Sequence, residues 1–347
     1  MPALHDDPEA VKIVHQYGLG IHDTSSDSDC FAAEWQQRQL LEYLDFAIEA
    51  EDLGFDGLTL TEHHVPRISN PSPHLLIASA AARTTKIRLG TAITVLPLHN
   101  PVRVAEEAAM LDLLSNGRFE LGIGRGNPME YELMTGNQAA DSGPHFTENC
   151  ELLERALGAE EFTFEGTHHR LPHPIKLTPT SSRLPVWMAA QGDYSVDYAA
   201  SKGWNLLRNF GDTLAHRAAF DRYVAESARA GHLRTGANFM VSQFVCLGAT
   251  EPDARRSEER LLSIFSGLGR PTGPVTNTAA APRPPIVCGT PDQVLADLRR
   301  ILTETGARRL MIEAITIEET RLFAKHVLPG LRAIPATEPL RAVSSHS

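Results

Sequence analysis

The sequence predicts an α/β fold of the (β/α)8, or TIM, barrel class. Two observations carry this prediction. Eight short runs of apolar and β-branched residues lie along the 347-residue chain, and a segment with helical spacing follows each run. No linker-like composition separates these pairs into two domains. A doubly wound parallel sheet could hold the same units, but eight of them in one chain of this size favour a single barrel domain, residues 1–347.

The first four strand–helix pairs lie before residue 160. We expect strands at residues 11–21 (or only 16–21 of these), 57–61, 87–95 and 119–123. The helices that follow them are expected at 34–53, 71–85, 101–114 and 148–157. Residues 127–147 are polar, and we expect them to form an irregular loop that covers part of a site.

The second half of the chain repeats this pattern after a small hairpin insertion. The hairpin is expected at residues 162–164 and 168–170, and the strands at 185–189, 204–207, 238–247 and 309–313. The helices are expected at 193–201, 213–230, 252–265, from 290 onward, and 318–328. Residues 266–285, after the seventh strand, are rich in Gly, Pro, Thr and Ala, so we expect a mobile segment. Residues 1–10 and 331–347 are expected to be loose tails.

Composition and charge exclude several functional classes. The formal net charge of −11 disfavours general binding to nucleic acid or to anionic membranes, because both need a basic face. The four cysteines are far apart, which indicates isolated thiols and no zinc motif. Neither a secretory signal nor a membrane span is expected, so we predict a cytoplasmic protein.

Polar residues directly follow three of the predicted strands. Glu62, His63 and His64 follow the second strand, His99 follows the third, and Arg125 follows the fourth. In parallel α/β folds, catalytic residues gather at the carboxyl ends of strands. These positions therefore predict the rim of an active site.

The same stretch resembles a known family. Its motifs are EHH at 62–64, GTAITVLPLHNPVRVAEE at 90–107 and LDLLSNGRFELGIGRG at 111–126. In this order they resemble the bacterial luciferase-like, flavin-dependent monooxygenases. The resemblance is dense across residues 53–126 and traceable to about residue 328. It implies the barrel fold, and it implies that residues 266–285 form an active-site lid.

The two histidines are the candidate catalytic groups. An imidazole can donate or accept a proton near neutral pH, and a neighbouring carboxylate can fix its tautomer. The alternative is a histidine that only packs against the barrel wall. The resemblance implies that His63 lines the flavin site and supports the reaction, with Glu62 and His64 as supporting residues.

Three residues are candidate ligands of a phosphate group. The guanidinium of Arg125 can bind phosphate in bidentate fashion, although it could instead pair with Glu130. A helix start at 192–195 offers free amides, and the alternative there is ordinary capping by Asp193. The resemblance implies that Arg125, Gly192 and Ser195 hold the phosphate of flavin mononucleotide (FMN).

Two further cofactor positions are suggested by the resemblance. In relatives a non-proline cis peptide backs the flavin ring, which implies Ala92-Ile93 here, although the sequence alone indicates only core. Glu106 matches the family pattern as well. It could equally be a pairing carboxylate on a helix, and both interpretations stay open.

The chain also departs from the luciferases proper. Gly124 stands where they have a reactive cysteine, and Tyr131 replaces an acidic residue a few positions on. These differences disfavour light emission. No divergent second subunit is indicated, so a homodimer is expected.

The resemblance implies a two-component monooxygenase. Reduced FMN, a co-substrate, would come from a separate NAD(P)H flavin reductase, because no G-x-G-x-x-G nicotinamide motif follows a strand. Oxygen would be activated as a flavin peroxide and transferred to a small organic substrate. The alternatives are hydride transfer with a deazaflavin on the same fold and a barrel that binds flavin without turnover. A metallohydrolase is disfavoured, because the first strand lacks H-x-H and no metal site is expected.

Overall fold

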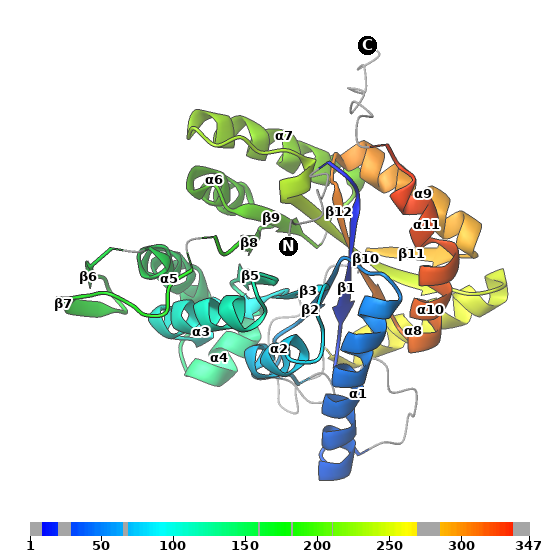
Figure 1. Ribbon diagram of the computed structural model, residues 1–347, viewed down its shortest axis with the longest axis horizontal. Coiled ribbons are helices and arrows are strands. Elements are labelled where there is room, and N and C mark those ends of the chain that lie inside the picture. The colour runs from blue at the N-terminus through cyan, green and yellow to red at the C-terminus, as the bar shows by residue number, and fades with distance from the viewer. Residues whose placement is uncertain are drawn as a thin grey trace. The chain divides into compact units, whose positions relative to one another are not determined.

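The computed structural model describes residues 9–19, 29–64, 69–158, 160–181, 183–209, 211–268 and 285–335 (Figure 1). The chain divides into two compact units. The first unit comprises Gln16–Asp52 and Asp56–Ala189, and the second comprises Met1–His15, Leu53–Phe55 and Ala190–Ser347. Each unit is built on its own set of parallel strands.

The strands of the first unit run in the order β2-β3-β5-β8, all parallel. Their bounds are Gly57–Leu60 for β2, Arg88–Thr91 for β3, Phe119–Gly124 for β5 and Val186–Ala189 for β8. A short strand, β4 (Thr94–Val95), continues the direction of β3 and pairs with the end of β5. The carboxyl ends of these strands therefore lie along one edge.

The described residues of the first unit form five α-helices. They are α1 (Ala33–Asp52), α2 (Pro73–Ala81), α3 (Pro101–Leu114), α4 (Pro128–Thr135) and α5 (Ser142–Leu157), with 3-10 turns η1 (Leu96–Leu98) and η2 (Ala139–Asp141). The start of α3 follows from local sequence: the Asn100 side chain accepts from the backbone N–H of Val102, and Pro101 occupies the first turn. An antiparallel hairpin of β6 (Phe162–Glu165) and β7 (Arg170–Ile175) follows α5.

The second unit is centred on the long strand β10 (Phe239–Leu247). Parallel to it lie β12 (Arg309–Ala314) and, at its two ends, β9 (Asn205–Arg208) and β11 (Ile286–Gly289). The first strand, β1 (Lys12–Tyr17), pairs with β12 in the register Ile13 to Leu310. The helices of this unit are α6 (Asp193–Lys202), α7 (Thr213–Arg229), α8 (Glu251–Leu268), α9 (Pro291–Thr305), α10 (Ile317–His326) and α11 (Leu328–Arg332), with the 3-10 turn η3 (Gly236–Asn238).

All eight predicted parallel strands are present. They correspond to β1, β2, β3 with β4, β5, β8, β9, β10 and β12. The helix start at residue 290 is also confirmed, because the backbone N–H of Thr290 donates to Gln293 Oε1 at 2.9 Å. The two units together thus contain the strands of a (β/α)8 barrel.

The prediction of an irregular loop at residues 127–147 is wrong. This stretch contains α4, η2 and the first six residues of α5. The Asn127 side chain caps α4 by accepting from Met129 N, Pro128 occupies its first position, and Gly136 ends it in the left-handed conformation. These capping signals outweigh the polar composition on which the loop prediction rested.

Smaller differences concern element ends. The second hairpin strand begins at Arg170, later than predicted, and β1 ends at Tyr17, short of residue 21. Strand β11 was not predicted, and α11 extends to Arg332, inside the predicted tail. The predicted lid at 266–285 lies outside the described residues, except that 266–268 belong to α8 and Pro285 precedes β11.

A close approach between β3 and β5 shapes the middle of the first unit. A Cβ atom on Gly122 would lie 1.9 Å from the carbonyl oxygen of Thr91, so no other residue fits there. The Thr91 hydroxyl accepts from Gly122 N at 3.0 Å and donates to Gly122 O at 2.7 Å. All six residues of β5 are buried, which makes this strand the core of the unit.

One carboxylate fastens α1 to the start of β3. Glu51 accepts from the backbone N–H groups of Thr85, Lys86 and Ile87 at 2.9, 2.6 and 2.8 Å. Burial raises the pKa of Glu51, but these backbone hydrogen bonds outweigh it and leave the pKa below its ordinary value.

No described helix is both long and apolar enough to cross a membrane.

We expect Glu51→Ala to lower the free energy of unfolding at neutral pH by about 1 kcal/mol, because three donors lose a charged acceptor to water. Because the folded pKa is depressed, this stabilisation is present above the unfolded pKa and disappears as the pH falls through the folded value. Urea unfolding at pH 7 and at pH 3 measures both effects. Asp45→Ala, on an exposed position of the same helix, is the control. A difference from wild type that does not shrink in acid would contradict this assignment.

Candidate active site

The structure places most of the predicted site residues on one edge of the first unit. Glu62, His63 and His64 directly follow β2, Ala92 and Ile93 lie between β3 and β4, and Arg125 directly follows β5. Because β2, β3 and β5 are neighbouring parallel strands, these residues share the carboxyl-end rim of the sheet. Gly192 and Ser195 belong to the second unit and are described separately below.

Glu62 is the hub of this rim. It is 2% exposed, and its Oε1 lies 2.8 Å from His99 Nε2 and 3.1 Å from His64 Nε2. Its Oε2 accepts from the backbone N–H of Val95 at 2.9 Å. With both oxygens bound in this way, Glu62 holds the ends of β2 and β4 together and orients two imidazoles. The role of Glu62 is therefore to position His64, His99 and the backbone of Val95.

The carboxylate changes the acid–base behaviour of His99. Burial lowers the pKa of His99, but the hydrogen bond and the charge of Glu62, with the charge of Glu107, outweigh burial and raise it overall. A raised pKa keeps His99 protonated into a higher pH range. The positive charge then compensates the buried carboxylate.

His63 is the more accessible member of the histidine pair. Its side chain is 35% exposed against 12% for His64. Its Nδ1 lies 3.2 Å from Oε1 of Glu130, a buried residue in the first turn of α4. The backbone of His63 is held from the other side, since Asn70 N donates to His63 O at 2.8 Å. This arrangement leaves the second ring nitrogen, Nε2, without a hydrogen-bond partner among the described residues.

Glu130 is a site residue that sequence reasoning assigned differently. The sequence suggested it as a possible partner of Arg125, whereas the structure pairs it with His63. Its position in the first turn of a helix would have been the signal, but that helix was interpreted as a loop. Its other oxygen, Oε2, is buried without a hydrogen-bond partner in the described part of the chain.

Arg125 is exposed, and within the described residues it has no ion pair or side-chain hydrogen bond. The two glycines beside it bring the backbone against the end of β3 and β4. A Cβ atom on Gly124 would lie 2.3 Å from Ile93 Cδ1, and one on Gly126 would lie 2.3 Å from Val95 Cγ1. Ile93 therefore fills the space beside Gly124, the position where luciferases have cysteine.

The peptide bond between Ala92 and Ile93 is cis, which confirms the geometry that the family resemblance implied. Two threonines flank it, and Thr94 Oγ1 donates to Thr91 Oγ1 at 3.1 Å. His74 extends this network, with Nε2 3.1 Å from Thr94 Oγ1 and Nδ1 2.9 Å from Glu107 Oε2. The hydrogen bond from His74 lowers the pKa of Glu107. His74 lay within a predicted helix and was not recognised from the sequence.

Glu106 lies on α3, where its Oε2 accepts from Arg103 Nη1 at 2.6 Å. This pairing matches the helix-surface interpretation that the sequence left open. A contact between Glu106 and a cofactor stays a prediction.

A second network supports the loop that carries His99. Asn149 of α5 is fully buried, and its Nδ2 donates to the carbonyl oxygen of Leu96 at 2.9 Å. Its Oδ1 lies 2.7 Å from His169 Nε2, in the hairpin insertion.

His145 lies beside this network, and its ring stacks on that of His168 with the ring centroids 4.3 Å apart. Its Nδ1 lies 3.1 Å from the Tyr131 hydroxyl. Tyr131, at the position of the missing acidic residue, is therefore a buried packing residue.

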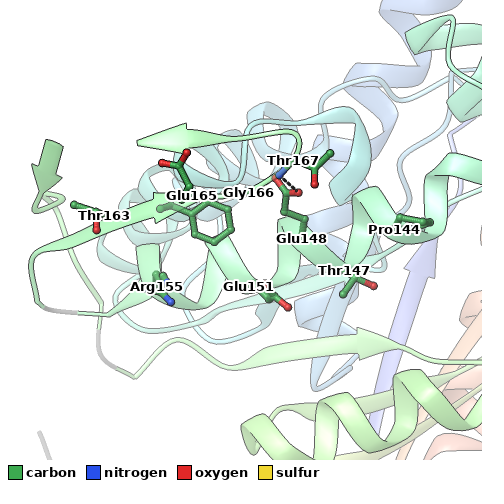
Figure 2. Close-up of a pocket in the computed structure, with 10 residues that line it drawn as sticks. Pro144, Thr147, Glu148, Glu151, Arg155, Thr163, Glu165, Gly166 and Thr167 are labelled. Carbon is green, nitrogen blue, oxygen red and sulfur yellow. Dashed lines mark hydrogen bonds between the residues drawn. The ribbon is translucent and has the colours of Figure 1, made fainter. Parts of the chain in front are cut away.

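An open hollow of about 810 Å³ lies between α5 and the β6–β7 hairpin (Figure 2). Figure 2 shows Glu148 bonded to the turn of the hairpin, where its Oε2 accepts from Thr167 N at 2.7 Å. Three carboxylates and one guanidinium line it, a charge balance that disfavours phosphate: Glu148, Glu151, Glu165 and Arg155. None of the predicted site residues lines this hollow. In the described chain no cluster of three or more His, Cys, Asp or Glu residues could hold a metal ion.

In the second unit, Gly192 and Ser195 stand at the start of α6. Gly192 is the N-cap residue, with no side-chain cap, and a Cβ atom placed on it would meet nothing within 4 Å. Ser195 Oγ donates to Gly192 O at 2.9 Å. Asp193 does not cap the helix, since its carboxylate lies 3.1 Å from Arg222. The first amides of α6 are thus open to a ligand.

The fold and this rim define the class of protein. The model of the luciferase-like monooxygenase family matches residues 25–309, and the chain belongs to this family. Among its relatives, an uncharacterized protein of Sinorhizobium fredii, y4wF, is 32% identical over 80% of this chain and 85% of its own length. The solved structure of monooxygenase RslO1 from Streptomyces bottropensis has a TM-score of 0.76 at 25% identity, covering 92% of this chain and 99% of that one. This match and the eight parallel strands confirm the predicted (β/α)8 barrel.

Other relatives show that the family includes two kinds of redox enzyme. The oxygenase component of the flavin-dependent trigonelline monooxygenase of Acinetobacter baylyi is 33% identical over 49% of each chain. The F420-dependent glucose-6-phosphate dehydrogenase of Nocardia farcinica is 26% identical over 88% of this chain and 98% of its own. The relatives therefore support an oxidoreductase.

We expect Glu62→Gln to lower the pKa of His99, because the substitution removes the charge that stabilises its imidazolium. Titration of the histidine ring protons by NMR measures this, with the resonance assigned by its loss in His99→Asn. Glu106→Gln, which removes a carboxylate from the neighbouring helix surface, should leave the His99 pKa unchanged. If Glu62→Gln also leaves it unchanged, Glu62 is not the hub described here.

Proposed function

We propose that the protein is the oxygenase of a two-component, FMN-dependent monooxygenase that oxygenates a small organic substrate. The observation that carries the proposal is the pairing of the half-exposed His63 with the buried Glu130. The same rim carries Arg125, which has no ion pair among the described residues. A positioned imidazole and an available guanidinium on neighbouring strand ends suit a phosphorylated redox cofactor and a proton-transfer step.

The residues present fit FMN. Arg125 has no carboxylate partner among the described residues, and the amides at the start of α6 are uncapped. We propose that Arg125, Gly192 and Ser195 bind the phosphate, that Ala92 and Ile93 back the flavin ring, and that Glu106 plays a supporting role. Reduced FMN would supply the electrons that activate oxygen.

His63 would accept and return a proton during the reaction. When its Nδ1–H donates to Glu130, Nε2 is unprotonated and can accept a proton from a bound molecule. Buried Glu130 then stabilises the imidazolium that results. Glu62 would keep His64 and His99 in place beside this pair. The rim so formed would hold a proton at a single atom while the surrounding barrel excludes water.

The partners follow from the same proposal. The trigonelline relative is named an oxygenase component, which supports a separate NAD(P)H flavin reductase for this chain as well. We propose a small organic substrate, a cytoplasmic location and a single barrel domain.

The second candidate is hydride transfer with a deazaflavin, favoured by the F420-dependent relative that matches most of this chain. Two adjacent histidines after β2 favour the oxygenase, because deazaflavin enzymes of this fold usually carry an acidic residue with a single histidine there. Comparing the affinities of reduced FMN and of F420 separates the two. If the protein binds FMN but leaves the reaction of reduced FMN with oxygen unchanged, it is neither a monooxygenase nor a deazaflavin enzyme but a flavin-binding barrel without turnover.

We expect His63→Ala to bind FMN within about twofold of wild type and to release hydrogen peroxide about tenfold faster when the reduced complex meets oxygen. A positioned general acid or base commonly changes a reaction rate by about 100-fold or more, so removing His63 can readily produce a tenfold change in peroxide release. Stopped-flow mixing with a peroxide assay measures the rate, and His326→Ala, at an exposed position of α10, is the control. An unchanged rate of peroxide release would remove His63 from the proposed mechanism.

We also propose that the protein forms a homodimer through an apolar face on α2 and α3. Neighbouring helices α2 and α3 expose Leu75, Met110, Leu113 and Leu114 at 70%, 51%, 61% and 63%. Large apolar side chains exposed on two neighbouring helices are typical of protein interfaces.

Leu113→Glu should therefore shift the protein to monomers, because it places a charge in the proposed interface. Sedimentation velocity measures the change. Leu233→Glu, at an apolar side chain that is 86% exposed in the second unit, should leave the dimer intact. A dimer that survives Leu113→Glu, or a wild-type monomer, would contradict this assignment.

A further inference from the structure

His74 connects helix α3 to strand β4. It lies in the first turn of α2, and its side chain is 11% exposed. Its Nδ1 lies 2.9 Å from Glu107 Oε2 of α3, and its Nε2 lies 3.1 Å from the hydroxyl oxygen of Thr94, a buried residue of β4. The ring also packs edge-on against Phe119 of β5. Because both ring nitrogens have polar partners, those partners fix how many hydrogens the ring carries.

The partner of Nε2 can only accept a hydrogen bond. Thr91 Oγ1 lies 2.7 Å from the carbonyl oxygen of Gly122, which has no hydrogen to give, so Thr91 donates its single hydroxyl hydrogen there. Gly122 N donates to the same hydroxyl oxygen at 3.0 Å. The contact between Thr94 Oγ1 and Thr91 Oγ1, at 3.1 Å, then needs the hydrogen of Thr94. With its hydrogen used in this way, Thr94 must accept from His74.

The partner of Nδ1 is a carboxylate that also has no hydrogen to give. The hydrogen bond from His74 lowers the pKa of Glu107 against the opposing effect of burial, and the charges of His74, Arg103 and His99 lower it further. Glu107 is therefore ionised at neutral pH, and Nδ1 must donate to it. Since Nε2 donates as well, the ring carries two hydrogens and a positive charge.

This series of hydrogen bonds ends at the backbone. Its last acceptor is the carbonyl oxygen of Gly122 in β5, and a peptide carbonyl has no hydrogen to pass on. The series therefore cannot deliver a proton to a bound molecule. It can hold Thr91 and Thr94, which stand on either side of Ala92 and Ile93 in the chain. A charged ring strengthens this hold, because a hydrogen bond from an ionised donor is roughly twice as strong as a neutral one.

We propose that His74 is a positioning residue, which as an imidazolium paired with Glu107 fixes the backbone from Thr91 to Thr94. We have proposed that this backbone lies behind the flavin ring, and in that respect the inference rests on the proposed function. The charge of His74 and the rigidity of this backbone are properties of the flavin-free protein. Their measurement does not depend on whether the chain binds FMN.

The charge of His74 is measured by NMR on the ¹⁵N-labelled, full-length protein without flavin, at about pH 7.5, where a free imidazole is mostly neutral. We expect two closely similar ring ¹⁵N shifts, as a doubly protonated imidazole gives, assigned by their loss in His74→Leu. Glu107→Gln removes the charge of the acceptor and should separate the two shifts, as in a neutral ring. Glu132→Gln, the same change at an exposed position of α4, should not. Two widely separated shifts in the wild-type protein would overturn the proposal.

The hold on the backbone is measured by amide hydrogen exchange in the same protein. The amides of Ala92 and Val95 donate hydrogen bonds of 2.8 and 2.9 Å, so their exchange reports on this segment. His74→Leu should raise both exchange rates about tenfold, because Thr94 loses a charged donor. Thr94→Val keeps the shape of the side chain and should have the same effect, which covers the case in which His74→Leu does not fold. Exchange at the wild-type rate in the folded variants would show that His74 does not hold the segment.

Calorimetric titration with FMN and with riboflavin separates this inference from the proposed function. If the wild-type protein binds both, His74→Leu should weaken them by the same factor, about tenfold, because both carry the flavin ring and only FMN carries a phosphate. Unchanged affinities would overturn the role of His74 at a flavin site. Wild-type protein that binds neither would remove the proposed function, while a charged His74 and faster exchange in its variants would still uphold the positioning role.

Discussion

The candidate site depends on one buried carboxylate. Glu62 binds His64, His99 and the backbone of Val95, and so links the end of β2 to the turn after β3. A buried carboxylate needs such compensation, and Glu62 in turn raises the pKa of His99 against the effect of burial. His63 follows Glu62 directly in the chain, so its position relative to Arg125 on the same edge depends on this link. The acid–base chemistry that we propose for His63 therefore begins with the anchoring of its neighbour.

Most of the fold could be predicted, because parallel strands buried on both faces are short apolar runs and each is followed by a helical segment. Strand β5, buried along its whole length, is the clearest example. The prediction was wrong at residues 127–147, where capping by Asn127 and Gly136 defines a polar helix that has little apolar periodicity. Strand β11 was missed because four residues beside a Gly- and Pro-rich stretch carry too weak a pattern.

The candidate site was predictable only where residues lie next to strand ends. Glu62, His63 and Arg125 were found in this way, and the cis peptide at Ala92-Ile93 followed from family resemblance alone. Glu130 was considered only as a partner of Arg125, and His74 and Asn149 were missed, because each of the three reaches the rim from a helix distant in sequence.

Anaerobic titration with reduced FMN, followed by mixing with oxygenated buffer, tests the central claim most directly. Flavin absorbance would report both binding and the return of oxidised FMN. We expect saturable binding of reduced FMN and a return of oxidised flavin that is markedly slower than in buffer, because the barrel shields the activated cofactor from water. No binding, or reoxidation as fast as in free solution, would contradict the assignment of this chain as an FMN-dependent oxygenase.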